Sequence, residues 1–195
     1  AIIDPKTDAE DERRYRYAEV FWKNKQRRGV NLLDAQKWMR ERNYFAAMMV
    51  NEGEADAMVT GYSRSYPSTV KPIMQLIGRA PGVTRIATTN MMLTKRGPLF
   101  LSDTAINPNP TADDLAKIAL MTARTVRMFG MEPVVAMVSF SNFGSSTDPG
   151  TTKVREAVAY LHREFPDLLV DGEIQADFAL NPEMLKDKFP FSKLA

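Results

Sequence analysis

The chain has 195 residues, of which 44% are hydrophobic, none is cysteine and only one, His162, is histidine. The lack of cysteine excludes disulfide scaffolds, thiolate zinc sites, iron–sulfur clusters and thiol nucleophiles, and a single histidine excludes sites built on paired histidines. The formal net charge of +2 provides no basic field for nucleic acid. No apolar run approaches the roughly 18 residues that span a membrane. Any chemistry must therefore use hydroxyls, carboxylates, lysine, arginine and backbone amides.

The N-terminus lacks the basic-then-apolar layout of a signal peptide, which predicts a cytoplasmic protein. It also lacks an initiator methionine, which indicates a trimmed or excised piece. The length allows one or two domains of ordinary size.

The first part of the chain is predicted to be mainly helical. From Asp8 to Arg28, acidic residues come first and basic residues last, as the helix dipole favours, and Gly29 can end the helix. The basic residues at the end of this helix could form a phosphate-binding patch. Basic residues are also common at helix C-termini for electrostatic reasons alone, so they need not bind a ligand. The next segments predict helices over 32–42 and 44–50, a short buried strand over 56–61, and a helix that begins near Ser68.

After Ala80-Pro81-Gly82 the pattern changes to strands alternating with amphipathic helices. Thr111 can cap a long helix that continues through Phe129. The continuous apolar run 133–140 is typical of a parallel strand covered on both faces. The other expected elements are strands over 83–93, 98–102 and 168–170 and helices over 151–165 and 174–187.

These elements predict an α/β fold with two domains and largely parallel sheets flanked by helices. The Pro-Gly break places part of a first α/β domain in residues 1–81 and most of a second in residues 82–195.

The loop between the strand at 133–140 and the following helix is rich in serine, threonine and glycine. In open α/β sheets, ligands bind beyond the carboxyl ends of strands, and the free N–H groups of a helix N-terminus favour an anion. Lys153 adds a positive charge. The loop therefore suits a phosphate or carboxylate, although a solvated loop with Thr151 or Thr152 as a simple helix cap would have the same composition. There is no nucleotide-binding P-loop pattern.

The segment Thr60-Gly61-Tyr62-Ser63-Arg64-Ser65 has the same character as this loop, so the two could share one anion crevice. Asp171, Glu173 and Asp177 could hold a divalent ion or act as a base, but such a trio more often caps a helix and pairs with lysine or arginine. His162 is expected to be a surface residue of a helix. The methionine-rich stretches fit core filling.

Several motifs, in one order along nearly the whole chain, resemble the phosphate acetyltransferase and butyryltransferase family. They are Asp56-Ala57-Met58-Val59-Thr60-Gly61, Ser68-Thr69-Val70-Lys71-Pro72, Asn107-Pro108-Asn109-Pro110-Thr111, Val138-Ser139-Phe140-Ser141 with Gly144-Ser145, Lys153-Val154-Arg155-Glu156-Ala157 and Asp171-Gly172-Glu173-Ile174-Gln175. The segments 64–69 and 141–146 are more similar to the C-terminal acyltransferase-like domain of NADP-dependent malic enzymes.

This resemblance implies a phosphotransacetylase-like fold of the isocitrate/isopropylmalate dehydrogenase type, incomplete at both ends. In the malic enzymes, NADP, malate and a divalent metal belong to a separate oxidoreductase half that is not visible here, and acetyl-CoA is a bound effector. Two arginine positions of active acetyltransferases align with Lys25 and Lys71, and lysine lacks the planar fork that grips phosphate. The resemblance therefore implies no confident catalytic residue and no metal ligand. The ligand-binding candidates are Lys25, Thr60, Ser63, Ser68, Lys71, Ser139, Ser141, Gly144, Ser145, Ser146 and Lys153.

Three functions follow, in this order. The first is an acyl-CoA-binding, regulatory and homo-oligomerising domain of an NADP-dependent malic enzyme. The second is an active phosphate acetyltransferase, which moves acetyl between phosphate and coenzyme A. The third is a structural dimerisation module without a ligand. The expected partners are a small-molecule acyl-CoA or acyl phosphate, and neither nucleic acid nor membrane.

Overall fold

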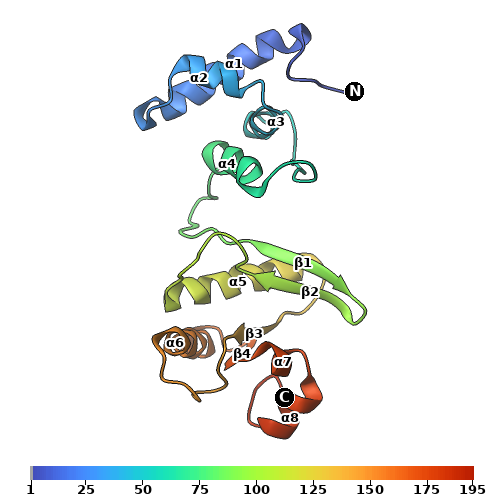
Figure 1. Cartoon of the computed structure of the whole chain (residues 1–195), viewed down its shortest axis with the longest axis vertical. Coiled ribbons are helices and arrows are strands. Elements are labelled where there is room, and N and C mark those ends of the chain that lie inside the picture. The colour runs from blue at the N-terminus through green and yellow to red at the C-terminus, as the bar shows by residue number, and fades with distance from the viewer. Residues whose placement is uncertain (1) are drawn as a thin grey trace. The chain divides into compact units, whose positions relative to one another are not determined.

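The computed structural model describes residues 2–195, which form two compact units that divide between Gly82 and Val83 (Figure 1). Each unit has a hydrophobic cluster of its own. None of the helices in residues 2–195 has the length and apolarity that a membrane crossing requires.

The described part of the first unit consists of helices and loops. Its α-helices are α1 (Asp11–Lys25), α2 (Leu32–Trp38), α3 (Arg42–Asn51) and α4 (Tyr66–Leu76), and short 3-10 turns flank α1 at Asp8–Glu10 and Gln26–Arg28. Gly29 follows in the left-handed region with a φ of 85°, as expected of the residue that ends a helix. The predicted helix over 32–42 is shorter, because the chain turns after Trp38 and α3 begins at Arg42.

Aromatic side chains from three helices form the core of the first unit. Tyr17 and Phe21 of α1 and Phe45 of α3 are almost completely buried. Trp38 of α2 stacks on Tyr44 of α3, with ring centroids 5.4 Å apart. Burial of such large rings contributes much of the stability of a small helical unit.

The predicted strand over 56–61 is wrong, and residues 2–82 contain helices and loops without a strand. That residues 1–81 are part of an α/β domain stays a prediction. Residues 56–61 have no strand pairing, and the side chain of Val59 is 99% exposed. A strand needs a neighbour for its backbone hydrogen bonds, and no described segment of this unit provides one.

The second unit contains two sheets of two strands each. Strands β1 (Thr89–Thr94) and β2 (Gly97–Ser102) form an antiparallel hairpin, and β3 (Val134–Val138) pairs in parallel with β4 (Leu169–Ile174). The fold is therefore α/β, but parallel and antiparallel pairings are equally represented where a largely parallel arrangement was predicted. The strand expected over 83–93 begins only at Thr89, and β4 extends beyond the predicted 168–170.

Helices α5 (Ala112–Met128) and α6 (Pro149–Glu164) pack against each other and against β3, and α6 also packs against β4. Alanines on their facing sides, including Ala116, Ala123 and Ala157, are buried with Leu161 and Val170 in one core. Small side chains at these positions allow close approach of the two helices. This core fixes α6, whose N-terminal turn follows the predicted anion-binding loop.

The strand β3 differs from the doubly covered strand that its apolar run predicts. Val134 and Val138, at its two ends, are 64% and 55% exposed. Among the described residues β3 pairs only with β4, so one of its edges has no neighbouring strand.

The predicted helix over 174–187 is two short helices, α7 (Ala176–Ala179) and α8 (Pro182–Lys188). Pro182 has no N–H to continue α7 and is well suited to the first turn of a new helix. The side chain of Asn181 caps α8 by accepting a hydrogen bond from the backbone N–H of Met184 at 3.2 Å.

Candidate functional site

The candidate site is the loop 139–148, which joins β3 to α6, together with the buried carboxylate beneath it. Strand pairing matches Met137 with Gly172 but Val138 with Ile174, so Glu173 is an extra residue in β4. Such a bulge turns a side chain away from the regular alternation of a strand. Glu173 is completely buried, and its Oε1 receives hydrogen bonds from the loop.

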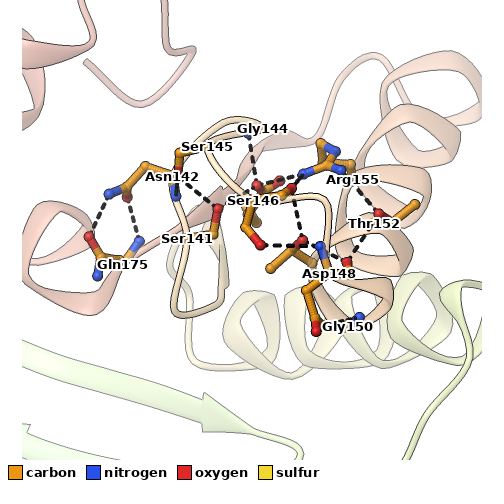
Figure 2. Close-up of polar contacts among 12 residues, drawn as sticks. Ser141, Asn142, Gly144, Ser145, Ser146, Asp148, Gly150, Thr152, Arg155 and Gln175 are labelled. Atoms are coloured by element: carbon orange, nitrogen blue, oxygen red, sulfur yellow. Dashed lines mark hydrogen bonds and ion pairs between the residues drawn. The ribbon is translucent and has the colours of Figure 1, made fainter.

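Three donors from different parts of the chain converge on this one oxygen. The hydroxyl of Ser141 donates at 3.1 Å, the backbone N–H of Gly144 at 2.8 Å and Nη1 of Arg155 in α6 at 2.8 Å (Figure 2). Glu173 therefore ties the loop to both β4 and α6. Its second oxygen, Oε2, is also buried and has no hydrogen-bond partner among the described residues.

Burial and hydrogen bonding act in opposite directions on this carboxyl group. Burial raises the pKa of Glu173, but the hydrogen bonds from Gly144, Arg155 and Ser141 lower it, and the net pKa lies below the ordinary value of 4.5. Glu173 is therefore ionised at neutral pH, and its negative charge is matched by Arg155. A buried charge with these partners serves to hold the loop in one conformation.

Arg155 and Asp148 organise the start of α6. Arg155 also donates to the carbonyl of Ser146 at 3.0 Å and, through Nη2, to the hydroxyl of Thr152 at 3.1 Å. Asp148 caps the helix, accepting a hydrogen bond from the N–H of Gly150 at 2.6 Å (Figure 2). The partly exposed Arg155 and the buried Glu173 thus form an ion pair at the base of the loop.

The expectation that the N-terminal amides of α6 are free for an anion is wrong. The N–H of Gly150 bonds to the Asp148 carboxylate, and those of Thr151 and Thr152 bond to its backbone carbonyl. A carboxylate thus already occupies the place that the helix dipole makes favourable for negative charge. The helix cap is Asp148, not Thr151 or Thr152.

The outer part of the loop is fixed by an amide pair. Asn142 Nδ2 donates to Gln175 Oε1 at 2.6 Å, and the backbone N–H of Gln175 donates to Asn142 Oδ1 at 2.8 Å (Figure 2). Phe143 has a φ of 44°, which is unusual for a residue with a side chain. Its ring packs edge-on against Phe191, with centroids 5.1 Å apart.

The structure brings most of the predicted residues of the second unit together. The buried Ser141 shares a hydrogen bond with the exposed Ser145 at 2.9 Å, and Ser139 donates its N–H to the carbonyl of Ile174 at 2.9 Å. Ser146 accepts from Arg155 through its carbonyl. Lys153 extends from α6 toward the segment before α5, where Nζ donates to Asn109 Oδ1 at 2.8 Å.

In the first unit, Asn43 connects two predicted residues. Thr60 donates its hydroxyl to Asn43 Oδ1 at 2.8 Å, and Asn43 Nδ2 donates to the carbonyl of Ser68 at 3.3 Å. Lys71 lies over the Trp38 ring at 5.7 Å. Ser63 is exposed, and Lys25 is half-buried at the end of α1. A crevice shared with the loop 139–148 stays a prediction.

The interpretation of the acidic trio as structural is supported for Glu173, which pairs with Arg155. Asp171 is buried and accepts a hydrogen bond from the hydroxyl of Ser192 at 2.9 Å. No group of three or more histidine or acidic side chains in residues 2–195 is placed to hold a metal ion. His162 lies in α6 as predicted but is half-buried, with Nε2 2.7 Å from the carbonyl of Val170.

Sequence reasoning missed Arg155, Asn43 and Asn109 as candidates and did not give Glu173 its central place. A glycine inside a strand often marks a bulge, so Gly172 is the signal that could have singled out Glu173. The partners of Arg155, Asn43 and Asn109 come from segments distant in sequence, and no local pattern indicates them.

Three comparisons with known proteins agree on the family. The family model Phosphate acetyl/butaryl transferase matches residues 1–195. A phosphate acetyltransferase of Clostridium acetobutylicum is 37% identical over 201 residues, covering 100% of this chain and 60% of the relative. An NADP-dependent malic enzyme of Escherichia coli is 38% identical over 185 residues, covering 94% of this chain and 24% of the relative.

A crystal structure of a phosphotransacetylase from Streptococcus pyogenes superposes with a TM-score of 0.78 at 38% identity, covering 98% of this chain and 57% of that chain. A phosphotransacetylase from Staphylococcus aureus gives a TM-score of 0.74 at 34% identity, covering 97% of this chain and 57% of that chain. The α/β fold is thus similar to phosphotransacetylase structures, while the likeness to the dehydrogenases stays a prediction. The chain spans between about a quarter and three-fifths of the length of the curated relatives it matches. With its whole length matched by the family model, the chain belongs to the phosphate acetyl/butaryl transferase family.

Proposed function

We propose that this chain binds an acyl-CoA, with acetyl-CoA as the first candidate, and is the regulatory and oligomerising acyltransferase-like part of an NADP-dependent malic enzyme. Malic enzymes that match 94% or more of the chain at 38% identity support this parentage. The parent would decarboxylate malate to pyruvate in its oxidoreductase half, which would also hold NADP and the divalent metal.

The observation that favours binding without catalysis is the state of the Ser141 hydroxyl. Ser141 is only 3% exposed, and its hydroxyl is engaged by both Glu173 and Ser145. A group held in this way shapes a loop but is not presented to a substrate. The lysines at positions 25 and 71, where the family resemblance expects arginine, further favour binding over catalysis, since lysine cannot form the bidentate contact to phosphate.

The test is isothermal titration of the full-length parent with acetyl-CoA and with acetyl phosphate, combined with malate turnover. We expect heat of binding with acetyl-CoA and a change in turnover at saturating ligand. Absence of heat together with unchanged malate turnover would refute the regulatory function.

The second candidate is an active phosphate acetyltransferase, favoured by relatives of that name that cover the whole chain at 37% and 38% identity. A thiol-release assay on the complete protein separates the two candidates. Under our proposal, release from acetyl-CoA with phosphate stays at background, and Ser141→Ala does not change it.

Ser192→Ala is the matched control in this assay, because Ser192 is also buried and hydrogen-bonded to a carboxylate, Asp171, but lies outside the loop. Thiol release well above background that is lost in Ser141→Ala and kept in Ser192→Ala would establish the acetyltransferase instead.

A further inference from the structure

The contact between Lys153 and Asn109 joins the first turns of α6, directly after the candidate loop, to the segment that precedes α5. Lys153 Nζ lies 2.8 Å from Asn109 Oδ1, and the two residues are 44 positions apart. Lys153 makes no ion pair with a carboxylate among the described residues. Arg155, two positions along the same helix, is by contrast neutralised by Glu173. Within residues 2–195, the positive charge of Lys153 is therefore not compensated by a carboxylate, unlike that of Arg155 on the same helix.

The segment that carries Asn109 is fixed at its beginning by Asp103. The Asp103 carboxylate accepts hydrogen bonds from the N–H groups of Thr88 at 3.0 Å and Asn107 at 2.7 Å, and from Asn107 Nδ2 at 2.6 Å. Burial raises the pKa of Asp103, but hydrogen bonds from the hydroxyl and the N–H of Thr88 and from the side chain of Asn107 hold this pKa well below its ordinary value. The ionised Asp103 thus fixes Asn107, which lies two positions before Asn109 in the chain.

The same segment is fixed at its end by the cap of α5. Thr111 and Asp114 form a capping box, in which the N–H of Asp114 donates to the Thr111 hydroxyl at 3.2 Å and the N–H of Thr111 donates to the Asp114 carboxylate at 3.1 Å. Arg85 pairs with Asp114 at 2.6 Å. Prolines at 108 and 110 restrict the backbone on either side of Asn109. Asn109 is therefore held in place from both directions.

From this geometry we propose that Asn109 is a positioning residue, which holds Lys153 beside the loop while leaving its positive charge available to the anionic part of the ligand. The inference rests on the proposed binding function and names a residue through which that function acts. A neutral amide oxygen can accept the hydrogen bond of an ammonium group without neutralising it, whereas a carboxylate at the same place would compete with the ligand.

The test compares Asn109→Asp with the wild-type chain by isothermal titration with acetyl-CoA and, separately, with acetyl phosphate. The substitution keeps the size of the side chain and adds a negative charge beside Lys153. We expect affinity to fall about tenfold at low ionic strength. Asn90→Asp is the matched control, because Asn90 is exposed on β1 and the change in net charge is the same. We expect the Asn90→Asp variant to bind acetyl-CoA and acetyl phosphate with the affinity of the wild type.

A double-mutant cycle shows whether Asn109 acts through Lys153. In a Lys153→Ala background, Asn109→Asp should produce a clearly smaller loss of affinity, because only the direct repulsion between the new carboxylate and the anionic ligand remains. An equal loss in both backgrounds, or equal affinities of the Asn109→Asp and Asn90→Asp variants, would overturn the positioning role while leaving ligand binding established. Absence of binding in the wild type would overturn both the positioning role and the proposed function.

Discussion

At the scale of the residue, Glu173 determines the conformation of the candidate loop. One carboxylate oxygen joins Ser141, Gly144 and Arg155, which come from the loop and from α6. Removing a buried charged partner leaves the others unsatisfied, and this costs more than the loss of an exposed ion pair. Stability and loop geometry therefore depend on the same side chain.

We predict that Glu173→Gln lowers the free energy of unfolding by about 2 kcal/mol at pH 7. The pKa of Glu173 is below its ordinary value in the folded state, so its contribution is complete above that ordinary value of 4.5 and is lost as the pH falls through the folded pKa. Urea unfolding at pH 7 and at pH values below 4.5 should show the difference between variant and wild type narrowing toward acid.

Glu164→Gln is the control for this prediction, because Glu164 also pairs with an arginine, Arg163, but its side chain is 46% exposed. Its effect should stay within about 0.5 kcal/mol. A Glu173→Gln variant as stable as Glu164→Gln at pH 7 would contradict the structural role of Glu173.

At the scale of the element, α5 depends on its capping box. We predict that Thr111→Ala lowers the free energy of unfolding by about 1 kcal/mol, because the N–H of Asp114 loses its acceptor. Thr122→Ala, in the middle of the same helix, is the matched control and should change stability by less than half as much, since its hydroxyl bonds only to the carbonyl of Ile118. Thermal unfolding followed by circular dichroism measures both, and equal losses would contradict the prediction.

The elements also show what could be predicted from the sequence. Helix α5 was predictable because its cap, its periodic apolar face and its terminating Gly130 are all local signals. The expected strand over 56–61 was wrong because strand formation depends on a neighbour, which local composition does not reveal. The serines of the loop were found by composition, whereas Arg155 and Asn109 act through contacts with residues 18 and 44 positions away.

At the scale of the whole molecule, the second unit exposes an apolar cavity of about 480 Å³, lined by residues of β2, α5 and β3. Val138, at one end of β3, is 55% exposed and lines this cavity. The free edge of β3 has no neighbouring strand within residues 2–195, and such an edge beside apolar surface favours association between copies of a chain. The predicted homo-oligomer is not tested by the structure and stays a prediction.

We predict that Val138→Lys reduces concentration-dependent association, measured by light scattering, because a charge on an exposed edge opposes strand pairing. Its effect on unfolding should be about 0.5 kcal/mol or less. Asn90→Lys adds the same charge at an exposed position of β1 and should leave association unchanged. Equal association of the two variants would show that the edge of β3 is not responsible.

The close approach of Gly172 to β3 limits which side chains position 172 of this chain can accept. A Cβ at position 172 would lie 2.5 Å from the carbonyl oxygen of Met137, and the φ of 142° is itself unfavourable for a side chain. Adding one methyl group would push the two strands apart and move the neighbouring Glu173 away from the loop. Selection on the conformation of the loop 139–148 can therefore act on a residue that has no functional group of its own.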